Sequence, residues 1–78
     1  MTIIRLSKMT IGQSGEIQDL TGDSGLCHRL LEMGITKGTP VEVVRFAPLG
    51  DPIDIKLRGY HLSLRRREAE NIQVLIKG

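Results

Sequence analysis

The side chains best suited to chemistry in this chain are one cysteine and two histidines, Cys27, His28 and His61. Thiolates and imidazoles are good ligands for transition-metal ions. Cys27 and His28 are adjacent in a predicted helix, where neighbouring side chains point about 100° apart and do not easily share one ion. His61 has no partner at a ligand-like spacing. We therefore predict no metal site within one chain, and these three residues are the candidates that a metal titration would test.

The sequence contains no recognisable set of catalytic residues. Its serines lie outside any nucleophile-elbow motif, and its glycines form neither a P-loop nor a dinucleotide-binding fingerprint. A chain of 78 residues is also too short to surround a deep cleft with a full catalytic apparatus. We predict that the protein is not an enzyme and has no cofactor, with Fe(II) or another transition metal as the alternative.

Basic residues are concentrated in one segment, residues 56–67, which contains five lysines and arginines and no acidic residue. Small barrels bind single-stranded nucleic acid by combining a basic groove with aromatic side chains on which the bases stack. Here Phe46 and Tyr60 are the only such aromatic residues, and the net charge is only +2. The composition therefore argues against nucleic acid as the partner, although a small nucleic-acid-binding barrel is kept as an alternative function.

Length and composition indicate a single domain spanning residues 1–78. The single cysteine excludes an intrachain disulfide, which fits a reducing cytoplasm. No segment approaches the roughly 20 apolar residues of a membrane span, and the N-terminus lacks the pattern of a signal peptide. We expect a cytoplasmic protein without direct membrane insertion, which serves any membrane process through a partner. Homo-oligomerisation is left open.

One helix is predicted over residues 24–33. Asp23 or Ser24 can cap its first turn, and Gly34 can end it because glycine adopts a left-handed conformation without steric cost. Ile35 is then placed to pack back on the helix, as in a Schellman motif. The apolar residues Leu26, Cys27, Leu30 and Leu31 are expected on one buried stripe.

The remaining segments favour short strands. Alternating apolar residues predict strands over residues 53–58, 61–65 and 72–76, and short apolar or β-branched runs predict strands over 3–6, 16–20 and 40–46. In the 40–46 strand, apolar residues on both faces suggest that both faces are covered. Residues 14–15 are expected to form a turn, and 66–71 one helical turn. We predict a mainly β fold, a small SH3-like barrel of five to six antiparallel strands with one capping α-helix.

The segment between the strands at 40–46 and 53–58 is the strongest candidate for a binding surface. It contains two prolines, which limit the entropy lost on binding, and an apolar Leu49 at its tip that has no obvious core role. We predict that a protein partner contacts Leu49, Gly50, Asp51 and Pro52, together with Arg65 from the basic segment.

Four blocks of this sequence match the signature of a known family. Residues 29–35, RLLEMGI, followed by Lys37-Gly38, resemble the "LLEMGI–KG" signature of the FeoA family, the A component of bacterial ferrous iron transport. Residues 43–52, VVRFAPLGDP, resemble its "V–R–APLGDP" loop, and residues 60–69 resemble its "–LSLR–EA–" block. The segment Ile72-Gln73-Val74 fits the family's last strand. The similarity runs in order from about residue 7 to the end of the chain.

The resemblance implies an SH3-like fold and a partner. The implied function is that of a cytoplasmic accessory protein of bacterial Fe(II) uptake, which acts on the cytoplasmic region of the GTP-binding membrane transporter FeoB. A transition-metal-binding carrier or sensor is the second alternative, because the family is associated with transition-metal ions. A family resemblance does not locate the binding site.

Overall fold

The computed structural model describes residues 2–76. The strands are β1 (Thr2–Arg5), β2 (Ser14–Leu20), β3 (Pro40–Phe46), β4 (Ile53–Leu57), β5 (Tyr60–Leu64) and β6 (Ile72–Ile76), and the helices are η1 (Leu6–Lys8, a 3-10 turn), α1 (Ser24–Glu32) and α2 (Arg66–Ala69). All the strands were predicted to within two residues, but η1 was not predicted. The α1 and α2 helices match the predicted helix and helical turn.

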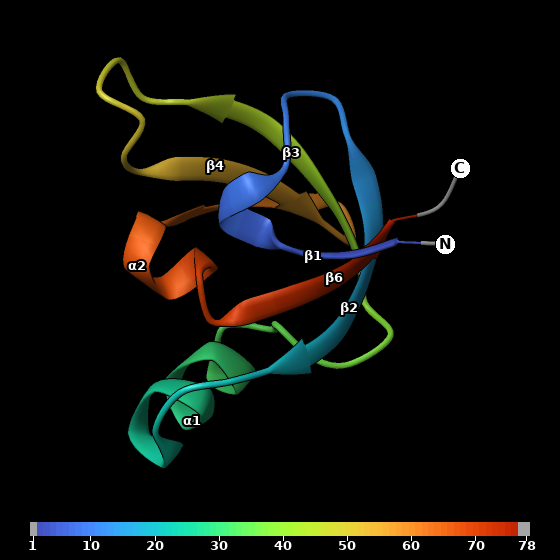
Figure 1. Cartoon of the computed structure of the whole chain (residues 1–78), viewed down its shortest axis with the longest axis vertical. Helices are drawn as coiled ribbons and strands as arrows, with labels where there is room; N and C mark the ends of the chain where they lie inside the picture. Colours follow the sequence, from blue (N-terminus) through green and yellow to red (C-terminus); the bar gives the residue numbers. More distant parts are fainter. Residues whose placement is uncertain (1, 77–78) are drawn as a thin grey trace.

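The six strands form one antiparallel sheet in the order β1-β6-β2-β3-β4-β5. The edge strands β1 and β5 run directly into η1 and α2, and these two short helices contact each other. The sheet therefore bends into a partly closed barrel, with α1 at one end and the β3–β4 loop at the other (Figure 1). The mainly β fold with one principal helix is as predicted.

The core lies inside this bend and consists of residues that are almost fully buried. These residues are Leu6, Met9, Ile17, Leu30, Ile35, Val41, Val43, Ile53, Ile55, Leu57, Leu64, Ala69, Ile72 and Val74. The alternation in β4 is strict, because its three apolar residues are buried while Asp54 and Lys56 are not. The alternation of apolar and polar residues in the sequence thus predicts the inward face of this strand correctly.

The expectation for α1 was partly wrong. Asp23 caps the helix by accepting a hydrogen bond from the Leu26 amide (2.8 Å), and the predicted Schellman end is present, with the Ile35 amide donating to the Leu30 carbonyl (3.0 Å). Leu31, however, is 47 % exposed. The helix packs on the core through a single narrow stripe that contains Leu26, Leu30 and Met33, so a residue one position away from Leu30 faces solvent.

Two further expectations about the strands are corrected by the structure. Residues 14–15 belong to β2 and not to a turn; Gly15 is required there because a Cβ atom would overlap the Leu75 carbonyl oxygen of β6. The outer face of β3 is not covered, since Val44 is 37 % exposed. A β-bulge between Val43 and Arg45 shifts the register, which turns Phe46 toward the core instead.

Candidate protein-binding site

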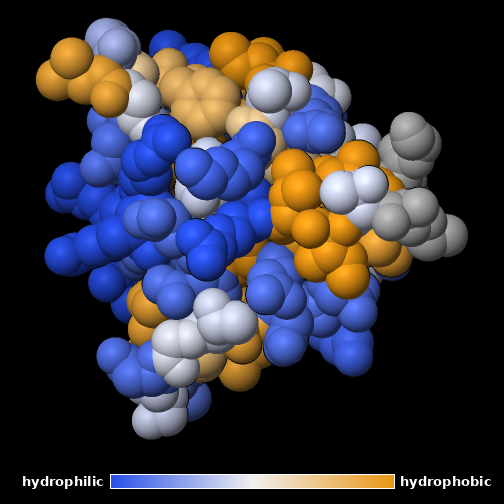
Figure 2. Space-filling view, in the orientation of Figure 1, coloured by the Kyte–Doolittle hydropathy of each residue, from blue (hydrophilic) through white to orange (hydrophobic). Residues whose placement is uncertain are grey.

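The β3–β4 loop, residues 47–52, is a compact turn that projects from the barrel. The Gly50 amide donates to the Ala47 carbonyl (2.7 Å), and the Ala47 amide donates to the Pro52 carbonyl (3.0 Å), so the loop is closed by its own backbone. Gly50 has φ +83°, a value that L residues rarely adopt. These constraints place Leu49 at the tip with 96 % of its surface exposed. Figure 2 shows this tip as an apolar projection beside a hydrophilic surface over α2.

The loop is held against the body of the protein by α2. The Arg66 backbone amide, at the first position of α2, donates to Asp51 Oδ1 (3.0 Å). The Arg66 guanidinium also reaches the Gly50 carbonyl oxygen at 3.5 Å. Asp51 thus supplies an acceptor to an α2 amide that has no intrahelical partner. The loop and α2 are therefore joined by contacts between residues 15 or more positions apart in the sequence.

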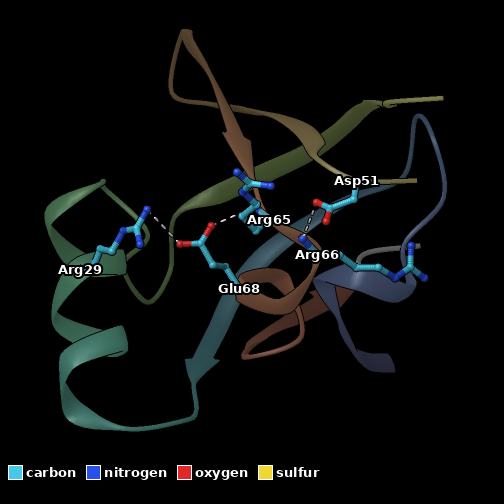
Figure 3. Close-up of polar contacts among 5 residues, drawn as sticks. All are labelled: Arg29, Asp51, Arg65, Arg66 and Glu68. Atoms are coloured by element: carbon cyan, nitrogen blue, oxygen red, sulfur yellow. Dashed lines mark hydrogen bonds and ion pairs between the residues drawn. The ribbon is translucent and has the colours of Figure 1, made fainter. Parts of the chain in front are cut away.

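A second contact joins α2 to α1. Glu68 is 4 % exposed, and its Oε1 accepts a hydrogen bond from the Arg65 backbone amide (2.9 Å). Its Oε2 lies 3.4 Å from Arg29 Nη2 of α1 (Figure 3). A buried carboxylate needs such partners, because desolvating a charge without compensation is costly. The Glu68 carboxylate therefore fixes α2, and through α2 the loop, relative to the capping helix.

The predicted partner-binding residues are brought together by this arrangement. Asp51 and Arg65 line one shallow hollow with Arg67, although they are far apart in the sequence. Leu49, Gly50 and the neighbouring Pro52 form the adjacent loop. Sequence reasoning missed the residues that position them, namely Arg29, Arg66 and Glu68. A glutamate at the third helical position is one half of the capping-box pattern, so Glu68 was the available signal, although Arg65 is not a residue that supplies the other half.

The basic segment 56–67 does not form one basic face. Lys56 and Arg58 lie near the β4–β5 turn, whereas Arg65, Arg66 and Arg67 lie at the other end of β5. A strand of five residues separates the two groups by roughly 16 Å. The predicted single basic stretch is therefore divided by the hairpin, and its three arginines beside the loop are the part that adjoins the candidate site.

The candidate metal ligands Cys27, His28 and His61 lie in different environments. The Cys27 thiol donates to the Thr21 carbonyl oxygen (3.4 Å). His28 Nδ1 faces Glu32 on the exposed side of α1 at 3.5 Å. His61 lies on the exposed surface of β5. Within residues 2–76, no three His, Cys, Asp or Glu side chains are grouped so that they could hold a metal ion.

A polar cluster on the outer face of the sheet surrounds Asp54. Its carboxylate accepts hydrogen bonds from the Ser63 hydroxyl and from Arg45 Nε (2.9 Å). These two contacts, the Ser63 hydrogen bond first, hold the pKa of Asp54 below its ordinary value of 3.8. The cluster ties β3, β4 and β5 together on the outer face of the sheet, because Arg45, Asp54 and Ser63 come from these three strands in turn.

The fold and the candidate site define a small barrel whose β3–β4 loop is held in place by contacts with α2. Comparison with known proteins then assigns the family. Residues 4–75 match the FeoA domain family, and the chain belongs to this family.

Its relatives include a fusion protein and two solved structures. The chain is 38 % identical over 71 residues to the Fe(2+) transport protein A/Fe(2+) transporter FeoB fusion protein of Porphyromonas gingivalis, and the match covers 91 % of this chain but only 8 % of that protein. The solution structure of the FeoA-like protein from Clostridium acetobutylicum is 38 % identical, with a TM-score of 0.89, and the match covers 97 % of this chain and 90 % of that one.

A third relative is the zinc-complexed FeoA of Stenotrophomonas maltophilia, which is described as an SH3 domain protein. It is 27 % identical, has a TM-score of 0.71, and the match covers 95 % of this chain and 89 % of that one. The predicted SH3-like barrel is thereby confirmed. In the part of the chain that the structure describes, no helix is long and apolar enough to cross a membrane.

Proposed function

We propose that this protein is an accessory component of ferrous iron uptake, which binds the cytoplasmic region of a FeoB-type transporter through the β3–β4 loop. In this proposal the protein works by binding and not by chemistry, on the cytoplasmic side of the membrane. Leu49 is the apolar anchor of the contact, and Gly50, Asp51, Pro52 and Arg65 surround it.

The fusion relative supports the choice of partner. In the Porphyromonas gingivalis protein, a segment similar to this chain is covalently joined to a ferrous iron transporter. A covalent link raises the effective concentration of one module near the other, to the millimolar range for a short flexible linker. Such a link makes even a weak contact between the two modules persist. A separate chain of the same family would make that contact through its own affinity.

The exposure of Leu49 is the observation that carries the proposal. An apolar side chain with 96 % of its surface in water gains nothing from its position in the isolated protein. Burying it against a partner would contribute about 1.5–3 kcal/mol, which is roughly a tenfold to hundredfold change in affinity. The loop is already closed by backbone hydrogen bonds and tied to α2, so little of this free energy is lost in ordering it.

The test compares two exposed leucines. Leu49→Asp is expected to weaken binding to the purified cytoplasmic region of the transporter about tenfold or more, and to leave the melting temperature nearly unchanged. The matched control is Leu31→Asp, which removes a 47 % exposed leucine from α1, at the opposite end of the molecule from the loop (Figure 1). Biolayer interferometry measures the affinity, and circular dichroism measures the melting temperature of the same samples.

Three results would contradict the proposal. Full-strength binding by a folded Leu49→Asp protein would move the contact away from the loop. Loss of binding in Leu31→Asp alone would move it to α1. No saturable binding by the unmodified protein would remove the transporter as the direct partner.

A further inference from the structure

One edge of the sheet ends in a strand that lacks the features with which proteins protect sheet edges. β5 pairs with β4 on one side, and among residues 2–76 no strand pairs with its other side. Natural proteins protect such an edge with a charged side chain, a proline, a bulge or a very short strand. β5 has five residues, Tyr-His-Leu-Ser-Leu, and its register with β4 is regular. The opposite edge strand, β1, has only four residues and carries Arg5. β5 is therefore the edge that is open to a further strand.

The backbone groups on the free side of β5 belong to His61 and Ser63. Residues 58–59 form the turn between β4 and β5, so Tyr60 is the first residue of β5 to exchange hydrogen bonds with β4. In an antiparallel pair every second residue does so. His61 and Ser63 therefore direct their N–H and C=O groups away from β4. In the described part of the chain these groups have no other hydrogen-bond partner.

The apolar side chains of β5 are also incompletely covered. Leu62 and Leu64 both point to the inner face of the sheet, because they lie opposite buried residues of β4. Leu64 is fully buried, but Leu62 is only half-buried. Tyr60 points to the same face and is 45 % exposed. A strand added to the free edge would thus satisfy backbone groups and cover apolar surface at the same time.

We propose that β5 pairs with β5 of a second copy of this chain, antiparallel and centred on Leu62. In this register His61 of each copy lies opposite Ser63 of the other, and the two residues exchange both of their hydrogen bonds. All the outward backbone groups are then paired. A shift by two residues in either direction would bring Gly59 of the turn or Arg65 into the ladder. The Arg65 amide is already bound to Glu68 (2.9 Å), so the register centred on Leu62 is the one that the strand can complete.

The side chains favour a second copy over an unrelated strand, because β5 is complementary to itself. Leu62 of one copy would meet Leu62 of the other at a position without hydrogen bonds, where side chains across two strands are closest. On the outer face His61 would lie beside Ser63, so two like charges are not placed directly opposite. A two-fold axis through Leu62 also closes the assembly at two copies. Pairing of β5 with β1 of another copy would be heterologous and open-ended.

The dimer goes beyond the proposed function and does not depend on it. Leu49 is not part of the paired segment, so Leu49→Asp is expected to leave dimerisation unchanged. The two-fold axis reverses the direction of the strands, so the β3–β4 loops of the two copies would lie toward opposite ends of the paired strands. A dimer would therefore present two transporter-binding loops, and loss of either interaction can be measured without loss of the other.

The first experiment measures self-association of the 78-residue chain. Paired five-residue strands bury less than the roughly 1,200 Å² of a standard interface, so we expect a weak dimer. Sedimentation velocity from about 20 μM to about 1 mM is expected to show a rise from monomer toward dimer. Over the same range, the amide protons of His61 and Ser63 are expected to gain protection from hydrogen exchange. The amide protons of Tyr60 and Leu62, which already bond to β4, are expected to change less.

The second experiment removes the outward amide of His61. Proline has no N–H group, and it is tolerated in edge strands where the N–H faces solvent. His61→Pro is therefore expected to keep the fold and to weaken the dimer about tenfold or more, because the two-fold axis doubles the loss. The matched control is His61→Thr, which removes the same side chain but keeps the amide and is expected to dimerise as the unmodified protein does. Circular dichroism checks that both variants are folded.

The third experiment tests the register and the identity of the partner. Leu62→Lys and Leu62→Glu each place two like charges opposite one another at the two-fold axis, so each variant alone is expected to be monomeric. An equimolar mixture of the two places opposite charges there and is expected to form a dimer. Only a partner that presents position 62 against position 62 gives this result.

Several outcomes would overturn the inference. A chain that stays monomeric up to about 1 mM would do so, as would equal dimerisation of His61→Pro and His61→Thr. A mixture of Leu62→Lys and Leu62→Glu that associates no more than either variant alone would exclude the register. Oligomers larger than a dimer would indicate open-ended pairing. Protection of the His61 and Ser63 amides only after addition of the transporter's cytoplasmic region would assign the edge to a partner strand instead.

Discussion

Gly34 offers a sharp test of how the capping helix is attached to the barrel. Gly34 follows α1 with φ +92°, and a Cβ atom at this position would overlap the hydroxyl oxygen of Tyr60 in β5. That hydroxyl donates a hydrogen bond to the Met33 carbonyl at the helix end (2.9 Å). Gly34→Ala therefore imposes two costs at once, an unfavourable backbone conformation and the displacement of the Tyr60 side chain.

The expected loss of stability in Gly34→Ala follows from these two costs. A non-glycine residue in the left-handed region costs about 1–2 kcal/mol. Loss of the hydrogen bond from Tyr60 costs about 0.5–1.5 kcal/mol. Because Tyr60 is 45 % exposed, its ring can move into solvent, and further strain is relieved. We expect Gly34→Ala to lower the free energy of unfolding by about 2–3 kcal/mol, and the melting temperature by about 10 °C or more.

The control variants separate the two costs. Gly38 has φ +88°, but a methyl group added there would meet no other atom within 4 Å, so Gly38→Ala carries the backbone cost alone. In a Tyr60→Phe background the obstructing oxygen is gone, and the nearest ring carbon lies at an ordinary contact distance of 3.5 Å. The double variant is therefore expected to lose about 1 kcal/mol less than the sum of the single variants.

Urea unfolding followed by circular dichroism measures all four variants. Strict additivity between Gly34→Ala and Tyr60→Phe, together with equal costs for Gly34→Ala and Gly38→Ala, would refute the reasoning. It would mean that the Tyr60 hydroxyl does not restrict Gly34 and that the helix end is held in another way.

Two further perturbations address the polar contacts. The pKa of Asp54 is lowered in the folded protein, first by the Ser63 hydrogen bond and then by the Arg45 hydrogen bond. The ionised Asp54 carboxylate therefore stabilises the fold above the ordinary pKa of 3.8, and this stabilisation is lost as the pH falls through the lower pKa of the folded state. Asp54→Asn is expected to flatten the fall in stability over that acidic range in urea unfolding, and an unchanged pH profile would contradict this. Glu68→Gln keeps an acceptor for the Arg65 amide and is expected to cost about 1 kcal/mol, whereas Glu68→Ala leaves that amide unpaired and is expected to cost about 2–3 kcal/mol. Equal costs for the two variants in urea unfolding would show that this hydrogen bond does not hold α2 in place.

Much of the fold could be predicted from the sequence because it depends on local rules. The alternation of Ile53, Ile55 and Leu57 identifies a strand and its inward face, since side chains in a strand point to opposite sides in turn. Gly34 identifies the end of α1 because the left-handed conformation favours glycine over any other residue. The β3–β4 loop was predicted from its two prolines for the same kind of local reason.

Other features were decided by packing between distant segments. Leu30 is buried and Leu31 is exposed, although the two are adjacent leucines, because the barrel contacts only one stripe of α1. Phe46 faces inward because a bulge changes the register of β3 against β4. No local pattern distinguishes these choices, since the neighbour that covers each side chain comes from elsewhere in the chain.

In the candidate site, too, some features follow from the local sequence and others from contacts between distant segments. The sequence by itself determined that residues 47–52 form an exposed, proline-limited loop with an apolar tip, because backbone restrictions of proline and glycine act within a few residues. The tertiary structure alone decided that Asp51 meets Arg66 and that Glu68 is buried beside Arg29. Those residues come together when the barrel closes, and hydrogen bonds and charges act between atoms that are close in space, whatever their separation in the sequence.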